Sequence, residues 1–188
     1  MIKTVYWSGR TAIVRKVPAK PLVYLAKHGY INGYSLYHGR GKDHAGTDLI
    51  KSIVGNNRVL DTDPSDLPEA CNNFEGCSCN RHIFDTVLSI YVINTINKKE
   101  RKCLFEEVKM YLAHDGYAYF AVRGRGDGGY ARSKNWKKYD DGFITSKKTF
   151  QRFYTPSELI KELKCYFKTV VILNGTSKSA TVIARVSL

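Results

Sequence analysis

Residues 83–93 read IFDTVLSIYVI and form the most strand-like stretch of this 188-residue chain. Their nearly continuous apolar character is typical of a strand that is buried on both faces of a parallel sheet. Residues 117–122, which read YAYFAV, form a second run of this kind. Four apolar residues between the two runs share one helix face by their spacing: Leu104, Val108, Tyr111 and Leu112. The alternation of strand, helix and strand predicts an α/β fold with a mostly parallel sheet.

Toward the N-terminus the same alternation continues. A short strand at 34–37 leads into the glycine-containing turn HGRG at 38–41. A helix follows, which Asp43 or Thr47 would cap and which would end at residues 55–57, because Gly and Asn tolerate the left-handed conformation. Residues 58–61 then predict a second short strand.

Toward the C-terminus, Asp115-Gly116 is expected to stop the helix that begins after residue 94. Residues 124–145 are rich in glycine and charge and are expected to form a long loop. A helix at 157–164 and two strands, at 167–173 and 180–186, complete the chain. The short turn between the last two strands predicts an antiparallel edge of the sheet.

Length and composition indicate one folded domain. The chain is 43% hydrophobic and 25% charged, which is typical of a globular protein. We expect residues 1–30 to form an N-terminal arm or small helical lid, and residues 31–188 to form a single domain. No run approaches the ~18 apolar residues of a membrane span, and no secretory signal is recognisable. With five cysteines, an odd number, we expect a reduced, cytoplasmic protein.

The charge balance is strongly basic. Thirty Lys and Arg against 17 Asp and Glu give a formal net charge of +13. A field of this sign attracts polyanions, so nucleic acid is the expected partner, although a basic surface that serves only solubility is the alternative. Five clusters carry most of the charge: Arg10, Arg15, Lys16 and Lys20; Lys98, Lys99, Arg101 and Lys102; Arg123 and Arg125; Arg132, Lys134, Lys137 and Lys138; Lys147, Lys148 and Arg152.

Ligands of open α/β sheets bind beyond the carboxyl ends of the strands, and four such ends carry candidate residues. The first is the loop Gly39-Arg40-Gly41, where missing side chains would let the backbone approach a ligand; a plain tight turn is the alternative. The second is Asp61, with Asp63 two residues on. A carboxylate there can accept hydrogen bonds from ribose hydroxyls, or form only an Asx turn or a helix cap.

At the third end, Asn94 follows a buried strand, where its amide could position a substrate or simply begin the next helix. At the fourth, Arg123 is followed by Gly124 and Gly126, and it could clamp an anion or lie free on the surface. The spacing of Cys71, Cys77, Cys79 and His82 does not match a paired zinc motif, so no metal site is expected.

Four segments together resemble a known family. They read SLYHGRGKD (35–43), VLDTDP (59–64), FDTVLSIYVINTI (84–96) and LAHDGYAYFAVR (112–123). They resemble motifs I, II, IV and V–VI of class I S-adenosylmethionine-dependent methyltransferases. Three further pieces are similar to methyltransferases associated with bacterial DNA phosphorothioation: RTAIVRK (10–16), YVINTI (91–96) and DGFITSKKTFQRFYTPSEL (141–159).

This resemblance implies a seven-stranded Rossmann-like sheet, mostly parallel with an antiparallel edge strand, that carries helices on both faces. It implies S-adenosylmethionine as the cofactor. The residues implied to lie around it are Tyr37, His38, Gly39, Gly41, Asp43, Asp61, Asp63, Asp85 and Ser89. Tyr91 and Asn94 would face the transferred methyl group. The substrate side would comprise Arg123, Asp141, Thr145, Gln151 and Tyr154.

The sequence also departs from the family. Ser35 replaces the acidic residue of the first motif, and Tyr37 replaces its first glycine. Either cofactor binding is weakened, or Asp43 or His38 substitutes for the lost carboxylate. The D/N-P-P-Y/F signature of amino-directed DNA methyltransferases is absent after residue 93, and no Pro-Cys pair is present for carbon-5 chemistry.

Two functions remain from these observations. One is a methyltransferase that acts on or near nucleic acid, with DNA favoured over RNA. The other is a catalytically inactive methyltransferase-like protein that binds nucleic acid, or a nucleic-acid enzyme, through its basic surface.

Overall fold

The computed structural model describes residues 14–62, 82–128 and 134–188. Within these residues the main sheet has six strands, in the order β2-β1-β3-β4-β9-β8, rather than the seven that the resemblance implied. These strands are β1 (Ser35–His38), β2 (Val59–Thr62), β3 (Phe84–Ile90), β4 (Leu112–Arg123), β8 (Thr169–Asn174) and β9 (Thr181–Ser187). The first four in the sheet are parallel, which confirms the mostly parallel α/β fold. The closing antiparallel pair forms one edge as expected, although the antiparallel strand itself, β9, lies between β4 and β8.

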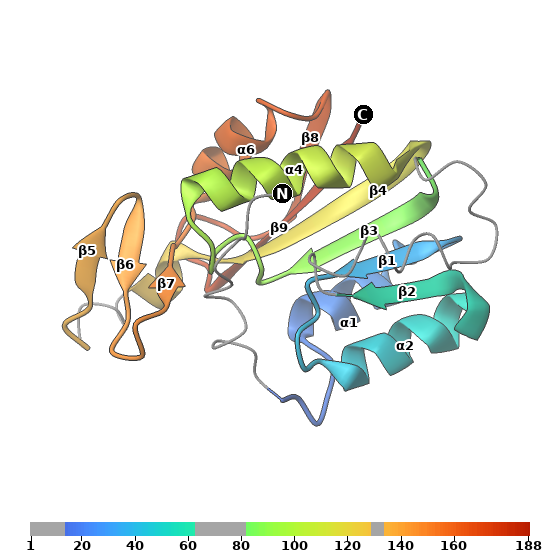
Figure 1. Ribbon diagram of the computed structural model, residues 1–188, viewed down its shortest axis with the longest axis horizontal. Coiled ribbons are helices and arrows are strands. Elements are labelled where there is room, and N and C mark those ends of the chain that lie inside the picture. The colour runs from blue at the N-terminus through green and yellow to red at the C-terminus, as the bar shows by residue number, and fades with distance from the viewer. Residues whose placement is uncertain (1–13, 63–81, 129–133) are drawn as a thin grey trace.

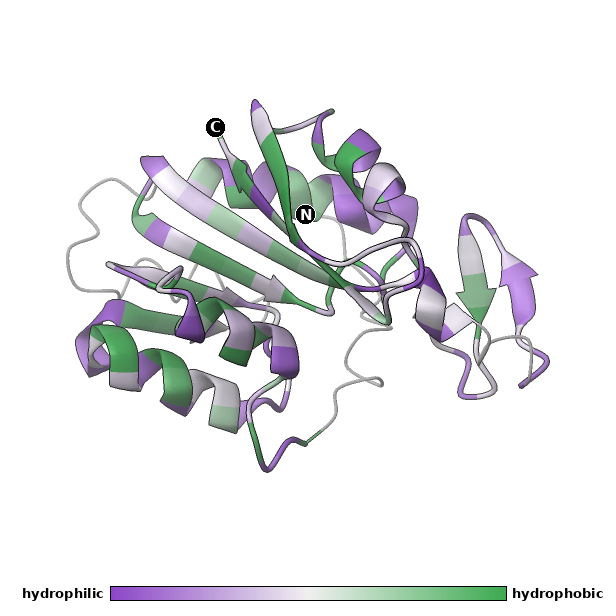
Figure 2. Cartoon of the chain, turned by 180° about the vertical axis from the view of Figure 1, so that it is seen from behind, coloured by the Kyte–Doolittle hydropathy of each residue, from purple (hydrophilic) through white to green (hydrophobic). Residues whose placement is uncertain are grey.

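Helices cover both faces of this sheet (Figure 1). On one face lie α1 (Lys20–Lys27) and α2 (His44–Val54), and on the other lie α4 (Lys98–Tyr111) and α6 (Pro156–Leu163). Neighbouring residues of β3 serve opposite faces, since Val87 packs with α4 and α6 whereas Leu88 packs with α1 and α2. This double burial explains why β3 reads as a continuous apolar run. Figure 2 shows the hydrophobic residues along these strands and on the sides of the helices that meet them.

The helix α1 is part of this core. Leu22 and Leu25 are fully buried and belong to the same apolar cluster as Ile50 of α2. Burying a leucine side chain stabilises a fold by roughly 1.5–3 kcal/mol, so α1 contributes to the stability of the sheet it covers. Residues 1–13 lie outside the described part of the chain.

The boundary between α4 and β4 differs from the expectation that Asp115-Gly116 stops the helix. The helix ends at Tyr111, and β4 begins at Leu112, which pairs with Phe84 of β3. Gly116 instead lies within the strand, at an irregularity in the pairing, where a Cβ would come within 2.9 Å of the carbonyl oxygen of Phe84. The glycine is therefore needed for a close approach of two strands rather than for a helix end.

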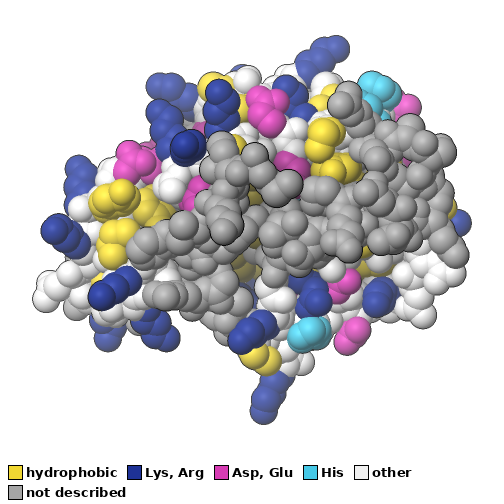
Figure 3. All heavy atoms as spheres, in the orientation of Figure 1, with side chains coloured by type: hydrophobic (Ala, Val, Ile, Leu, Met, Phe, Trp, Pro, Cys, Tyr) yellow, Lys and Arg dark blue, Asp and Glu magenta, His cyan; other side chains and the backbone are white. Residues whose placement is uncertain are grey.

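Part of the expected long loop is a second sheet. Its strands are β5 (Lys137–Tyr139), β6 (Gly142–Ile144) and β7 (Phe150–Gln151), all antiparallel. This small sheet lies beyond the carboxyl ends of the main strands, at the left of Figure 1. Lys and Arg side chains gather over it and over the adjoining end of α4 (Figure 3). Strands of two or three residues are too short to produce a recognisable alternation of polar and apolar residues.

Across the described ranges, no helix is both long and apolar enough to cross a membrane.

Candidate cofactor and substrate site

The fold brings the predicted strand ends to one edge of the main sheet. The strands β1, β2, β3 and β4 are parallel, so their carboxyl ends lie side by side. This edge therefore carries the loop after β1, the end of β2, the turn after β3 and the end of β4. Gly39 and Gly41 both have left-handed backbones, with φ of 69° and 58°. A Cβ on Gly39 would lie 3.0 Å from Cγ2 of Val92, so this loop packs directly against the turn that follows β3. The glycines are therefore required by the local geometry.

Asp61 is the acidic residue at the end of β2. Its Oδ2 accepts a hydrogen bond of 2.9 Å from the hydroxyl of Thr47 and lies 2.8 Å from Nε of Arg40. Its other oxygen, Oδ1, accepts no hydrogen bond from the described residues, and a quarter of the side chain is exposed. One oxygen of this carboxylate is thus available to a ligand. Sequence reasoning named Thr47 only as a helix cap and did not foresee that Arg40 of the loop would pair with Asp61.

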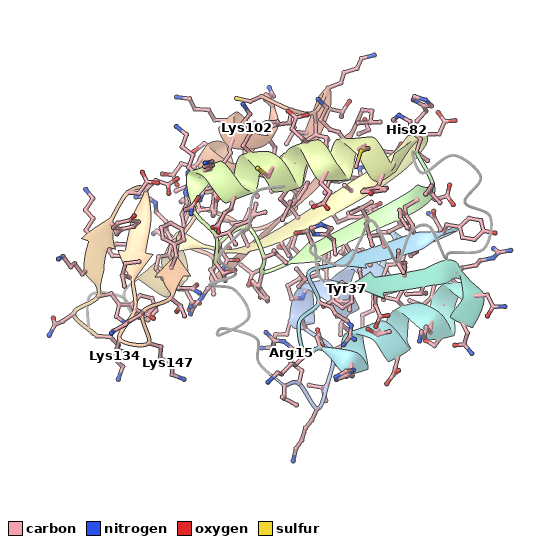
Figure 4. All side chains as sticks on the ribbon, in the orientation of Figure 1. Arg15, Tyr37, His82, Lys102, Lys134 and Lys147 are labelled. Carbon is pink, nitrogen blue, oxygen red and sulfur yellow. The ribbon has the colours of Figure 1, made fainter. Side chains whose placement is uncertain are left out.

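Tyr37 does not obstruct this loop. Its side chain is 1% exposed and lies between the sheet and α2, where a Cβ on Gly46 would come within 2.9 Å of the ring (Figure 4). Burial, together with the negative charge of Asp43, raises the pKa of the Tyr37 hydroxyl. This hydroxyl donates a hydrogen bond of 2.8 Å to Oδ2 of Asp43.

Asp43 cannot replace the carboxylate that the first motif lacks. Its Oδ1 accepts a hydrogen bond from the backbone N–H of Gly46 and so caps α2, as predicted, while its Oδ2 accepts the hydroxyl of Tyr37. The side chain is buried, so both oxygens serve the protein itself. The expectation that Asp43 supplies the missing ligand group is therefore not supported.

His38 and Ser89 lie inside the molecule, under α4. The side chain of His38 lies on the opposite face of the sheet from that of Tyr37. Nε2 of His38 lies 3.1 Å from Oε2 of Glu107. The register that pairs Tyr37 with Leu88 places His38 beside Ser89, one step further along the strands. Both are fully buried, and neither Nδ1 of His38 nor Oγ of Ser89 has a hydrogen-bond partner among the described residues. They are interior polar groups rather than groups on the surface of the loop.

Asp85 is at the wrong end of β3 for the predicted cofactor role. It lies near the amino end of the strand, about 16 Å from Ile90 at the rise of a β-strand. Its carboxylate accepts a hydrogen bond of 2.8 Å from the backbone N–H of Tyr34 and leaves no room for a side chain at Gly33. It therefore stabilises a turn at the opposite edge of the sheet. Asp63 lies outside the described residues.

Tyr91 begins the turn after β3 and is held in place by its neighbours. Its backbone is left-handed, with φ of 60°, and its hydroxyl lies 2.8 Å from Oγ1 of Thr181 on β9. The guanidinium of Arg15 lies 5.9 Å from the centre of the Tyr91 ring and 4.0 Å from Asp43. A residue of the N-terminal segment thus reaches the same edge as the predicted site (Figure 4).

Three of the predicted site residues meet in one cluster. Asn94 is 1% exposed, and its Nδ2 donates a hydrogen bond of 3.3 Å to Oε1 of Gln151 in β7. Nη1 of Arg123 donates to the same oxygen at 3.5 Å. Oδ1 of Asn94 is buried and has no partner in the described part of the chain. The cluster therefore contains a buried acceptor without a partner, which a donor group of a bound molecule could satisfy only after the side chains that cover Asn94 move.

Arg123 is held by two contacts besides Gln151. Its Nε and Nη2 lie 2.9 Å and 2.8 Å from Oδ2 of Asp127, and its guanidinium lies 5.4 Å from the centre of the Phe153 ring. Asp127 thus neutralises part of its charge, which weakens it as an anion clamp.

Asp141 belongs to an ion-pair network around the buried guanidinium of Arg101, while Asp141 itself stays exposed. The network also contains Arg101, Arg152 and Glu162. Arg101 is 0% exposed; its Nη2 donates to Asp141, and its Nε donates to Glu162 at 2.7 Å. Arg152 bridges the same two carboxylates at 2.6 Å and 2.9 Å. The network connects α4, α6 and the small sheet, and no sequence pattern links its members.

Thr145 is partly exposed, whereas Tyr154 is buried. The hydroxyl of Thr145 lies 2.8 Å from that of Thr149 and accepts the backbone N–H of Lys147, which closes the turn before β7. Tyr154 is fully buried, and the guanidinium of Arg152 lies 4.2 Å from its ring centre. Burial raises the pKa of this tyrosine.

The cysteines of the sequence cluster lie outside the described residues, whereas His82 is described. Its Nδ1 lies 2.7 Å from the carbonyl oxygen of Leu112, and its ring stacks on His114. Within the described ranges, no group of three or more His, Cys, Asp or Glu side chains could hold a metal ion.

Neither a protein-family model nor a curated protein matches this chain. Solved structures do resemble it. A S-adenosylmethionine-dependent methyltransferase from Clostridium acetobutylicum is 15% identical, with 95% of this chain and 94% of that one covered and a TM-score of 0.59. The 1,6-didemethyltoxoflavin-N1-methyltransferase of Burkholderia thailandensis, solved with S-adenosylhomocysteine, is 16% identical, with 89% and 77% covered and a TM-score of 0.57. The complex of DhpI with SAH gives 15% identity, 88% and 81% coverage and a TM-score of 0.58. At these identities the likeness establishes a shared fold, the Rossmann-like fold of class I methyltransferases.

Proposed function

We propose that the protein is an S-adenosylmethionine-dependent methyltransferase that acts on or near nucleic acid. The observation that carries the proposal is that the Gly39–Gly41 loop, Asp61 and Asn94 share the carboxyl edge of a methyltransferase-type sheet. Solved proteins of the same fold are described as complexes with S-adenosylhomocysteine, which supports the cofactor.

The residues present suit such a cofactor. Oδ1 of Asp61 is free to accept a hydrogen bond from a ribose hydroxyl, while Thr47 and Arg40 hold the other oxygen in place. The backbone of Gly39 and Gly41, which carry no side chain, can lie close to the methionine part. S-adenosylmethionine supplies a methyl group bonded to a positively charged sulfur.

Asn94 is the proposed positioning group for the methyl acceptor. Its Oδ1 would accept a hydrogen bond from the acceptor, while Gln151 fixes the amide through Nδ2. Methyl transfer is an in-line displacement, so the main requirement is alignment of the reacting atoms. An amide does not take up a proton at neutral pH, so Asn94 orients the acceptor but does not deprotonate it.

The charge of the chain supports a polyanionic partner. The net charge of +13 favours association with nucleic acid, and the resemblance to phosphorothioation-associated methyltransferases favours DNA over RNA.

The cofactor half of the proposal is tested by isothermal titration of S-adenosylmethionine. We expect Asp61→Ala to weaken binding at least about tenfold, because a lost charge-assisted hydrogen bond costs about 1.5–3 kcal/mol. Asp63→Ala is measured in parallel. Asp48→Ala, which removes an exposed acid of α2, serves as the matched control and should bind as the wild type does. Unchanged affinity in both Asp61→Ala and Asp63→Ala would remove these carboxylates from the site.

A second candidate is a methyltransferase-like binding protein without transferase activity. It is favoured by the ion pair of Arg40 with Asp61 and by the engagement of both oxygens of Asp43, which together reduce the groups available to a cofactor. A thermal-shift measurement separates the candidates. A folded protein whose melting temperature does not change with either S-adenosylmethionine or its demethylated product would favour the binding protein.

A further inference from the structure

We infer that a groove between the start of α4 and the small sheet binds single-stranded nucleic acid. This inference rests on the proposed function and deepens it, because it names the form of the nucleic acid and the surface that holds it. The groove has a volume of about 510 Å³. Its lining residues are Asn97, Lys98, Lys99, Lys102, Tyr139, Asp140 and Tyr166.

The lysines of this groove are available to phosphates. Lys98, Lys99 and Lys102 are exposed, and none of them forms an ion pair within the part of the chain that the structure describes. Their neighbour Arg101 is the opposite case, since it is fully buried between Asp141 and Glu162. The structure therefore divides one basic stretch into a buried cation that holds the fold together and three exposed cations. Lys98 and Lys102 lie one helical turn apart, about 6 Å along the axis of α4.

Two tyrosines flank these lysines. Tyr139 is 58% exposed and has no aromatic neighbour among the described residues, so its ring is available to a ligand. Tyr166 is partly buried, and its ring is supported by Phe105 at 4.9 Å between ring centres. An exposed ring and a supported ring beside a cationic groove form the combination by which proteins bind single strands. The lysines pair with phosphates while the rings stack on unpaired bases.

Further lysines lie on the small sheet. Lys137 and Lys138 of β5 are exposed, as are Lys147 and Lys148 in the turn before β7. Figure 3 shows Lys and Arg side chains over this end of the molecule, and Figure 4 places Lys102 and Lys147 on its two sides.

The groove also adjoins the candidate site. Asn97, which lines the groove, lies three residues after Asn94, and the small sheet contributes Tyr139 to the groove and Gln151 to the Asn94 cluster. The groove and the Asn94 cluster thus share the small sheet and the start of α4, although Asn94 itself is buried and does not line the groove.

Single-stranded nucleic acid suits the groove better than a duplex or an acidic peptide. In a duplex the bases are already stacked on one another, so Tyr139 would gain no partner. An acidic peptide would pair with the lysines but would not use the two tyrosine rings, and the carboxylate of Asp140 in the lining would oppose either polyanion alike.

The test measures fluorescence anisotropy of a labelled 12-residue oligothymidylate at several salt concentrations, without cofactor. We expect the double variant Lys98→Gln/Lys102→Gln to bind about tenfold more weakly and to lower the slope of log affinity against log salt by about 1.4, at about 0.7 per phosphate contact. Tyr139→Ala should also weaken binding about tenfold but leave the salt slope unchanged, because it removes stacking and no charge.

Lys20→Gln/Lys27→Gln is the matched control, since it removes two exposed helix lysines from the opposite side of the sheet. An equal loss of affinity for the oligothymidylate in this control would mean that only net charge matters, and it would overturn the assignment of binding to the groove. Tighter binding of a duplex of the same length, or no effect of Tyr139→Ala, would overturn the single-stranded form. If a polyglutamate peptide bound as tightly as the oligothymidylate, and Tyr139→Ala did not weaken its binding, the inference would be overturned in favour of an acidic protein partner.

These outcomes are separable from those of the proposed function. A protein that binds the oligothymidylate but no S-adenosylmethionine keeps this inference and loses the methyltransferase proposal. A protein that binds the cofactor but not the oligonucleotide loses this inference alone.

Discussion

Tyr37 occupies a position where the resembling family has a glycine, and its orientation decides what the replacement means. Side chains alternate between the two faces of a strand, and residue 37 faces α2 rather than the loop that follows. Gly46 on α2 provides the space for its ring. The substitution therefore fills the core and binds Asp43, and leaves the Gly39–Gly41 loop open.

Tyr37→Phe is expected to destabilise the protein by about 1–3 kcal/mol. The change removes the hydroxyl that satisfies Oδ2 of Asp43, which is buried and would be left without that donor. The free energy of unfolding is measured by guanidinium denaturation, and the comparison requires that its dependence on denaturant concentration, the m-value, is the same in both proteins. Tyr139→Phe, which removes an exposed hydroxyl, should change it by less than about 0.5 kcal/mol. Equal stability of Tyr37→Phe and the wild type would contradict the role of this hydrogen bond.

Among the elements, α4 and α6 have N-termini that the sequence encodes locally. Each begins with a capping box, formed by Asn97 with Glu100 in α4 and by Thr155 with Glu158 in α6. In α6, Glu158 also forms an ion pair with Arg125. Burial alone would raise the pKa of Glu158, but hydrogen bonds from the backbone of Thr155 and from Arg125 outweigh it and lower the pKa.

This shift predicts an acid-dependent contribution of α6 to stability. With its pKa lowered in the folded state, ionised Glu158 stabilises the protein above the unfolded pKa of about 4.3, and the contribution is lost as the pH falls below that value. Glu158→Gln should therefore flatten the dependence of the unfolding free energy on pH between about 3 and 5. Lys161→Gln on the same helix is the control, because lysines do not titrate in this window. If the unfolding free energy of Glu158→Gln changed with pH as steeply as that of the wild type between about pH 3 and 5, Glu158 would be excluded as a source of this pH dependence.

At the scale of the whole molecule, we expect the ion-pair network to make the small sheet unfold together with the main one. Arg101 connects α4 with Asp141 of the small sheet and Glu162 of α6, and it does so from a fully buried position. Arg152 still contacts both carboxylates when Arg101 is removed, so we expect a loss smaller than the about 3–5 kcal/mol that is typical when a buried ion pair loses one partner.

We expect the wild type to unfold in one transition. Far-UV circular dichroism reports all elements, and the fluorescence of Trp136, next to β5, reports the small sheet in a Trp7→Phe background. The two curves should coincide. In Arg101→Met the fluorescence transition should come at lower denaturant, whereas Lys102→Met, a change at the exposed neighbour, should keep the curves together. Coincident curves in Arg101→Met would mean that other contacts hold the small sheet.

The sequence by itself determined most elements of the main sheet and the edge that carries the site, but not the small sheet. The apolar runs of β3 and β4 are long enough to be recognised, and the caps at Asp43 and Thr155 act within a few residues of the chain. Because parallel strands point the same way, the sequence also predicted that Gly39, Asp61 and Asn94 would lie at one edge.

Only the tertiary structure decided which polar side chains reach that edge and which are used for stability. Asp141 and Glu162 lie 40 and 61 residues from Arg101, and Gln151 lies 57 residues from Asn94. Asp85 belongs to the right strand but to its opposite end. Contacts over such separations depend on how the elements pack, and a local pattern of residues contains no information about its distant partner.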